Sequence, residues 1–440
     1  FPLCTVTGAT TSHLIVSGDL SQFDNYQFYC KVIKSTCSEY SNVARFKIQP
    51  DPYFRSKQSG DWRLASTWET SPNGSDSWSP ACTFPWDSNS VSVEIMNGHQ
   101  VKITDNILIS PDVKIDQLKI LTGGQLKIET KARLDINDGI GTDLLVQGTL
   151  FDRGNSSYGI TFLNDAKWKL DTNGTIIKTG TSAVVGTYKD QFEGGISTIP
   201  ASANWIYRKD TLALPNIAAS GMFYPNLYFE DVYTGGASYV LTGSGDFMTV
   251  KGSLFVGDTG LAVTVSNNNT FSTPMKVLKN VSVGENSTYR IALTPIGKGI
   301  EVGGNIKNDG TFDINQTSSG LLRLNGNVTQ TISGIGVFDI WNMELDKTAQ
   351  SLVILDTNIE VKNQLSFSGG IINTQTNILN VSNGDPISAI IGFEIPNDSG
   401  VYSDDNYVIG KHRRSIGIPN NIYTFPVGDT VTKMGYNQAR

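Results

Sequence analysis

Residues 144–150 read LLVQGTL, a phrase of alternating apolar residues followed by Gly or Asn that recurs along the chain. The other copies are residues 248–254 (MTVKGSL), 300–306 (IEVGGNI), 322–328 (LRLNGNV) and 359–365 (IEVKNQL). Alternation with a period of two is typical of a strand with one buried face. The Gly or Asn at a fixed place indicates a bend. Such units cannot bury their apolar face alone, so they must stack on one another.

The repetition predicts an all-β protein built around a right-handed β-solenoid (β-helix), with β-sandwich modules on either side. The copies at 300 and 322 lie 22 residues apart, close to one solenoid coil. We expect the solenoid to span residues 62–400, with a less regular region at 184–247. The interior of the repeated phrase predicts these core residues: Val146, Leu150, Val250, Leu254, Val302, Ile306, Leu324, Val328, Val361 and Leu365.

The flanking segments have a different texture. Residues 1–49 are predicted to be part of an immunoglobulin-like β-sandwich, because Phe28 stands two residues before Cys30 as an aromatic does in strand F of that fold. Residues 50–61 contain Pro50 and Pro52 and are interpreted as a linker. Residues 401–440 are interpreted as the start of a further β-sandwich module.

The composition narrows the class of protein. Of 440 residues, 44 are Gly and only 17% are charged, whereas globular proteins average about a quarter charged residues. This profile favours a β-rich extracellular protein. The net charge of −7 comes without a basic patch, so a nucleic-acid partner is not expected. No apolar run approaches a membrane span. The start at Phe1 and the end at Arg440 lead us to expect a segment of a longer chain, with further domains as its partners.

Four cysteines lie in the first 82 residues. Cys30 and Cys37 flank six residues that could form a hairpin, so we expect a disulfide between them in an oxidising compartment. Cys4 and Cys82 are left open: they could pair with each other, pair with residues outside this sequence, or stay free. Scarce His and the lack of a C-x-x-C pair disfavour a zinc site.

Aromatic residues are the first candidates for ligand contact. Four tryptophans between residues 62 and 86 could stack on sugars or cap the open end of the solenoid, and capping is favoured because a first coil must be shielded. Trp205, Tyr224 and Tyr228 are candidate glycan contacts, weighed against buried strand positions.

Polar residues offer weaker chemistry. His99 is interpreted as a turn residue rather than a catalytic base. Asp404 with Asp405, or Asp135 with Asp138, could form an acid and base pair for glycoside cleavage, but turn formation is the favoured explanation. The turns at 137–139 and 308–310 could bind Ca²⁺, although no cofactor is expected.

Several phrases resemble the large secreted, adhesin-like surface proteins of Bacteroidota bacteria. These phrases include Gly60-Asp61-Trp62, Ser66-Thr67-Trp68-Glu69, Gly98-His99-Gln100-Val101, Thr329-Gln330-Thr331-Ile332-Ser333-Gly334 and Tyr423-Thr424-Phe425-Pro426-Val427-Gly428-Asp429. The resemblance implies export by type IX secretion, a cell-surface location, and roles in adhesion, gliding motility or polymer capture. It also implies O-glycosylation at Thr211 and Thr430, within the sequences Asp-Thr-Leu and Asp-Thr-Val.

The sequence thus favours a structural and adhesive protein of the cell surface, a rigid β-rod without enzymatic turnover. Its contacts could be surface glycans or other surface proteins, with the region 184–247 as the expected place. The alternative is a β-helix that binds or degrades polysaccharide, which a cleft lined by carboxylates and basic residues would favour.

Overall fold

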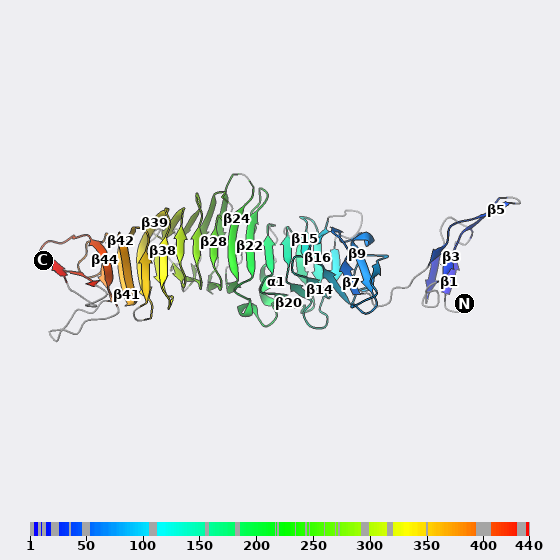
Figure 1. Cartoon of the computed structure of the whole chain (residues 1–440), viewed down its shortest axis with the longest axis horizontal. Coiled ribbons are helices and arrows are strands. Elements are labelled where there is room, and N and C mark those ends of the chain that lie inside the picture. Colours follow the sequence, from blue (N-terminus) through cyan, green and yellow to red (C-terminus); the bar gives the residue numbers. More distant parts are fainter. Residues whose placement is uncertain are drawn as a thin grey trace.

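The protein is described by a computed structural model that is nearly all β-structure, with 3% of its residues helical. Its main body is a β-solenoid of about 10 turns, stacked along the long axis of Figure 1. The structure describes these residues: 4–7, 10, 15–18, 26–34, 37–45, 53–104, 112–154, 158–180, 185–215, 217, 220–233, 235–242, 244–245, 247–258, 260–268, 270–271, 273–291, 299–314, 320–348, 351–392, 406–428 and 437–439.

The coils are joined by parallel ladders on three faces. In the longest ladder each strand pairs with the strand one coil further on: Leu254 pairs with Val281, and Val281 with Ile306. This first ladder contains β8 (Gly60–Asp61), β12 (Gln100–Ile103), β15 (Gln125–Ile128), β18 (Thr149–Asp152), β21 (Thr175–Lys178), β22 (Asn204–Lys209), β24 (Asn226–Asp231), β28 (Leu254–Val256), β32 (Val281–Val283), β35 (Ile306–Asn308), β38 (Gln330–Ser333), β40 (Leu352–Leu355), β42 (Ile371–Val381), β44 (Val408–Arg414) and β46 (Val427–Gly428).

The other two faces follow the same order in each coil. The second face contains β7 (Tyr53–Ser56), β11 (Ser92–Ile95), β14 (Leu118–Ile120), β17 (Leu144–Val146) and β20 (Trp168–Leu170), and later β23 (Met222–Tyr224), β27 (Met248–Val250), β31 (Met275–Val277), β34 (Ile300–Val302), β37 (Leu321–Leu324), β39 (Val337–Asp346), β41 (Ile359–Gly369) and β43 (Ile390–Ile391). The third contains β13 (Asp112–Ile115), β16 (Arg133–Ile136) and β19 (Gly159–Phe162), and later β25 (Ala237–Leu241), β29 (Val263–Asn267), β33 (Thr288–Ile291) and β36 (Thr311–Ile314). From there it continues through the long strands β39, β41, β42 and β44.

The solenoid core follows from the alternation of the repeated phrase. Nine of the ten predicted core residues have no exposed side-chain surface, whereas Val328 is 63% exposed, so that prediction was wrong. In the third copy of the phrase, Ile306 stands four residues after Val302. The equivalent interior residues of the next coil are Leu324 and Ile332, which stand eight residues apart. The longer turn carries Val328 outward, and Ile332 occupies the interior position instead. The right-handed winding stays a prediction.

Tryptophans close the first coil, in line with the predicted cap. The hairpin of β9 (Trp68–Ser71) and β10 (Ser79–Pro80) pairs antiparallel to β7, next to the short helix η2 (Ala65–Thr67). Trp62 and Trp68 are fully buried with ring centroids 4.9 Å apart. Their indole nitrogens donate to the backbone oxygens of Pro85 and Trp62. Arg55 lies 3.9 Å above the ring of Trp78.

The region 184–247 belongs largely to the solenoid. Its strands β22, β23, β24 and β25 all enter the ladders. Among the described residues, the less regular parts include α1 (Val185–Asp190), η3 (Ile196–Thr198) and the connection between β22 and β23. One short lateral pair, β26 (Ser244–Gly245) with β30 (Thr270–Phe271), accompanies the coils.

The two ends differ from the predicted domain boundaries. The solenoid begins at β7 rather than at residue 62, and β44 and β46 extend its parallel ladder to Gly428. β44 and β46 therefore pair with the solenoid, and a separate sandwich module after it is not shown. The pair β45 (Tyr423–Phe425) and β47 (Asn437–Ala439) is antiparallel.

Before the solenoid, the described residues form antiparallel pairs: β1 (Cys4–Thr7) with β2 (Ile15–Gly18), β3 (Gln27–Phe28) with β6 (Ala44–Arg45), and β4 (Lys31–Lys34) with β5 (Cys37–Tyr40). Both faces of β4 and β5 are exposed. A packed immunoglobulin-like sandwich is not shown by these pairs. Among the described helices, none is long and apolar enough to cross a membrane.

Candidate functional site

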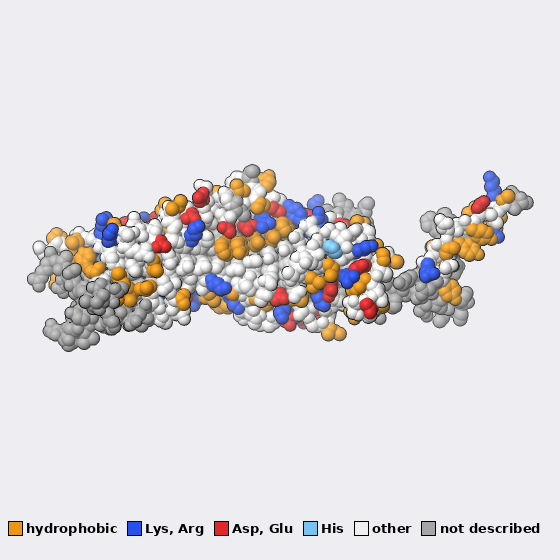
Figure 2. Space-filling view, in the orientation of Figure 1, with side chains coloured by type: hydrophobic (Ala, Val, Ile, Leu, Met, Phe, Trp, Pro, Cys, Tyr) orange, Lys and Arg blue, Asp and Glu red, His pale blue; other side chains and the backbone are white. Residues whose placement is uncertain are grey.

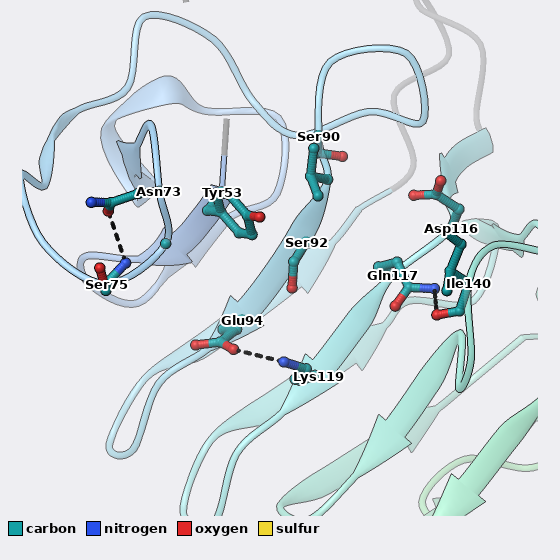
Figure 3. A pocket seen from close by; sticks show the side chains of 12 residues that line it. Tyr53, Asn73, Ser75, Ser90, Ser92, Glu94, Asp116, Gln117, Lys119 and Ile140 are labelled. Atoms are coloured by element: carbon teal, nitrogen blue, oxygen red, sulfur yellow. Dashed lines mark hydrogen bonds and ion pairs between the residues drawn. The ribbon is translucent and has the colours of Figure 1, made fainter. Parts of the chain in front are cut away.

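A groove of about 560 Å³ lies beside the first coils, between the hairpin of β9 and β10 and the segments that precede β11, β14 and β17. We call it the N-terminal groove (Figure 3). Most of the residues that line it have polar side chains: Tyr53, Asn73, Gly74, Ser75, Ser90, Val91, Ser92, Glu94, Asp116, Gln117, Lys119 and Ile140.

The floor of the groove is built from outward positions of adjacent strands. Glu94 of β11 pairs in register with Lys119 of β14 and with Arg55 of β7. Lys119 Nζ lies 3.2 Å from Glu94 Oε1, and Arg55 Nε lies 2.5 Å from Glu69 Oε1. Stacking at about 4.8 Å per coil thus aligns Arg55, Glu94 and Lys119 in a row of alternating charge.

Carboxylates gather at one end of the groove. Asp116 lines the groove and also a neighbouring hollow of about 400 Å³. Asp87 and Asp138 line that hollow as well. Burial raises the pKa of Asp116, and the nearby carboxylates of Asp143 and Asp87 add to the effect. Burial also raises the pKa of Asp143, whose oxygens accept from the backbone of Gly139 at 2.8 Å and of Lys167 at 2.6 Å. Asp143 therefore holds the turn that supports the groove.

The groove offers donors and acceptors side by side. An ammonium, an amide, hydroxyls and carboxylates face one hollow, and a few placed polar groups of this kind fix the orientation of a small polar ligand. Hydroxyl-rich molecules such as sugars match this mixture, because each sugar hydroxyl both donates and accepts. In the described ranges, no group of three or more His, Cys, Asp or Glu side chains is arranged to hold a metal ion.

Trp205 and Tyr224, two of the predicted glycan contacts, lie inside the solenoid and are fully buried. The alternation of β22 and β23 points them inward, where Trp205 meets Tyr224 edge to face at 5.4 Å. The hydroxyls of Tyr224 and Tyr207 lie 2.8 Å apart. Their prediction as glycan contacts was therefore wrong.

Tyr228 points outward, but its ring is stacked on Phe255 with centroids 4.4 Å apart and an angle of 7°. Ile206 is its in-register neighbour on the opposite side. Both faces of the Tyr228 ring therefore point along the solenoid axis toward side chains of adjacent coils. This disfavours stacking of a sugar on Tyr228.

Tyr228 belongs to an outward row of apolar residues on the first ladder, which we call the lateral stripe: Phe151, Ile177, Ile206, Tyr228 and Phe255. Figure 2 shows hydrophobic side chains gathered over the middle of the solenoid, with charged groups along their border. Arg208 and Glu230 form one of these bordering ion pairs at 2.7 Å. Tight packing along the axis leaves Ile177 buried and the other four side chains of the lateral stripe partly exposed.

The predicted disulfide is not formed. Cys30 and Cys37 are exposed free thiols, as is Cys82. Cys37 stands opposite Lys34 beside the turn of the hairpin, whereas the backbone oxygen of Cys30 accepts from Ser41 at its other end. Four residue pairs separate these positions, or about 14 Å at 3.4 Å per residue, well beyond the reach of a disulfide.

The other predicted site residues either make contacts within the fold or lie outside the described residues. Thr211 lies in a turn in which its hydroxyl accepts from the backbone of Ala213, and Thr430 lies outside the described residues, as do Asp404 and Asp405. His99 Nδ1 lies 2.9 Å from the hydroxyl of Ser56 in the turn before β12. Asp135 pairs with Arg133 at 2.6 Å, which accounts for it without acid and base chemistry.

The sequence interpretation missed Glu94, Asp116 and Lys119. A usable signal was present: Glu94 and Lys119 stand at the outward position of the triplets at 93–95 (VEI) and 118–120 (LKI), 25 residues apart. Aligning the chain by its coil length would have placed them side by side.

Comparisons with known protein families, with curated proteins and with solved structures found no match to this chain.

Proposed function

We propose that the chain is a structural and adhesive rod of the bacterial cell surface. The observation that carries this proposal is the parallel ladder that runs from β8 to β46. Along most of the rod, three faces of a coil bond to the next coil, so separating two such coils breaks three short ladders and exposes their shared core. The phrase-level resemblance to adhesin-like Bacteroidota proteins supports the same role, with immunoglobulin-like modules before the rod and export by type IX secretion.

The N-terminal groove is the place where we expect the rod to contact a polymer. It presents charged and neutral hydrogen-bonding groups to solvent at one end of the rod. We expect a surface glycan here rather than an apolar peptide, because most of the lining residues carry hydrogen-bonding side chains. This replaces the region 184–247, whose candidate aromatics are buried or stacked.

The adhesion test measures the attachment of beads coated with the chain to immobilised cell-surface polysaccharides. Replacing both members of the pair, Glu94→Ala with Lys119→Ala, is expected to lower attachment at least tenfold. Lys169→Ala is the matched control, because Lys169 lies in the same outward row two coils further on and outside the groove. Equal attachment by the groove variant and the control would contradict the assignment.

Polysaccharide cleavage is the second candidate, favoured by one observation: burial raises the pKa of Asp116 within a polar groove, as expected of a general acid. Turnover of acidic or neutral polysaccharides that disappears in Asp116→Asn would establish an enzyme. Attachment without turnover would favour the rod.

A further inference from the structure

Two side chains of opposite charge meet inside the solenoid. Asp152 ends β18 and Lys178 ends β21, and they are in-register neighbours on adjacent coils. Lys178 Nζ lies 2.6 Å from Asp152 Oδ2, and the two side chains are 1% and 0% exposed. The ladders thus hold an amine and a carboxyl group in contact, sealed from solvent.

The surroundings of this pair are built around the carboxyl group. Asp152 Oδ1 accepts from the backbone N–H of Gly154 at 2.8 Å. A Cβ on Gly159 would lie 2.9 Å from the same oxygen, so the glycine leaves room for the carboxyl group. Tyr188 of α1 packs its ring on Trp168 and Trp205 at 5.3 and 5.5 Å. Burial first, and then the charge of Asp152, raise the pKa of the Tyr188 hydroxyl.

We propose that Lys178 and Asp152 condense to an intramolecular isopeptide bond that joins the coils of β18 and β21. The ammonium first gives one proton to the carboxylate, and the neutral amine then attacks Cγ of Asp152. The Nζ–Cγ bond forms, the bond from Cγ to Oδ2 breaks, and the hydroxyl leaves with a second proton of the amine as water. Carboxylate and ammonium become amide and water, so no oxidant or reductant is required.

Three features of the site favour this step. Contact within a rigid ladder gives the amine a very high effective concentration at the carboxyl group. The Gly154 N–H is aimed at Oδ1, where negative charge develops in the tetrahedral intermediate. The Tyr188 hydroxyl can pass a proton to the leaving oxygen. The product also removes two charges whose burial is costly.

A second buried pair provides an internal control. Lys209 and Asp231 are in-register neighbours on β22 and β24, but their closest atoms are 3.7 Å apart. Lys209 Nζ donates to the backbone oxygen of Gly236 at 2.6 Å, which holds the amine away from the carboxyl group. We expect no bond between these two residues.

The test is peptide mapping of the purified full chain after denaturation. Trypsin cannot cleave after a bonded Lys178, so the bond predicts a branched peptide of residues 134–153 and 170–189, one water lighter than the sum of its parts. Residues around Lys209 and Asp231 are expected as ordinary linear peptides.

Variants sharpen the result. Lys178→Arg and Asp152→Ala are expected to restore the full intact mass, and Tyr188→Phe to slow the appearance of the branched peptide at least tenfold. The wild-type map decides even where a variant fails to fold. Recovery of 134–153 and 170–178 as separate linear peptides would overturn the proposal, as would loss of water without the branched peptide. The bond can be present or absent whatever the rod binds, so this result is independent of the adhesion test.

Discussion

Replacing Val302 with Asp tests whether the repeated phrase builds the core. Val302 is fully buried between Val277 and Leu324 of the neighbouring coils. Losing a buried Val costs about 1.5–3 kcal/mol, and burying a polar group without a partner costs about 2–7 kcal/mol more. We therefore expect Val302→Asp to lower the free energy of unfolding by about 5 kcal/mol. Most of this loss should affect the coils around β34, which are expected to open locally.

Val328→Asp is the matched control, because Val328 has the same side chain in the next copy of the phrase but is 63% exposed. Its effect is expected within about 0.5 kcal/mol. Urea unfolding measures the overall change, and hydrogen exchange locates it, since neighbouring coils can open separately. Equal effects of the two substitutions would refute the inward assignment of the phrase.

Three further predictions concern His412, Gly148 and the hairpin thiols. Burial first, and then the charge of Arg414, lower the pKa of His412 to about 4. The unfolded chain therefore takes up the proton at higher pH, and we expect stability to fall by about 2 kcal/mol from pH 7 to pH 5. Hydrogen exchange of the last coils measures this loss, which His412→Phe should abolish. Gly148→Ala should destabilise by about 1–3 kcal/mol in urea unfolding, because its Cβ would lie 2.3 Å from the oxygen of Gly124. Cys30 and Cys37 should both react with iodoacetamide without reduction, and resistance in mass spectrometry would contradict the free thiols.

The general fold could be predicted because alternation and stacking are local properties of the sequence. The phrase at 300–306 identifies a strand, a bend and a strand, and ladder pairing follows from the repeat. The error at Val328 arose where the turn after Leu324 is longer than in the previous coil. Lys347 donates to Gly326 and Val328 oxygens there, a long-range contact that no local pattern reveals.

The candidate site was harder to predict because it depends on which residues the coils bring together. Glu94 and Lys119 become neighbours only when the coil length is known. Trp205 is a predicted glycan contact, although the alternation of β22 places it inside. Asp152 and Lys178 follow the same rule: each stands two residues after an inward residue, Leu150 or Ile176, so inward charges were detectable from the sequence.

The central claim is that coils stack in the register described, and cysteine cross-linking tests it most directly. In a chain whose four native cysteines are replaced by Ser, Gln100→Cys and Gln125→Cys would face each other on adjacent coils, since these residues pair in register. Rapid disulfide formation is expected for this pair. Gln100→Cys with Thr149→Cys, two coils apart, should not cross-link. Equal cross-linking of the two pairs, or none in either, would contradict the solenoid.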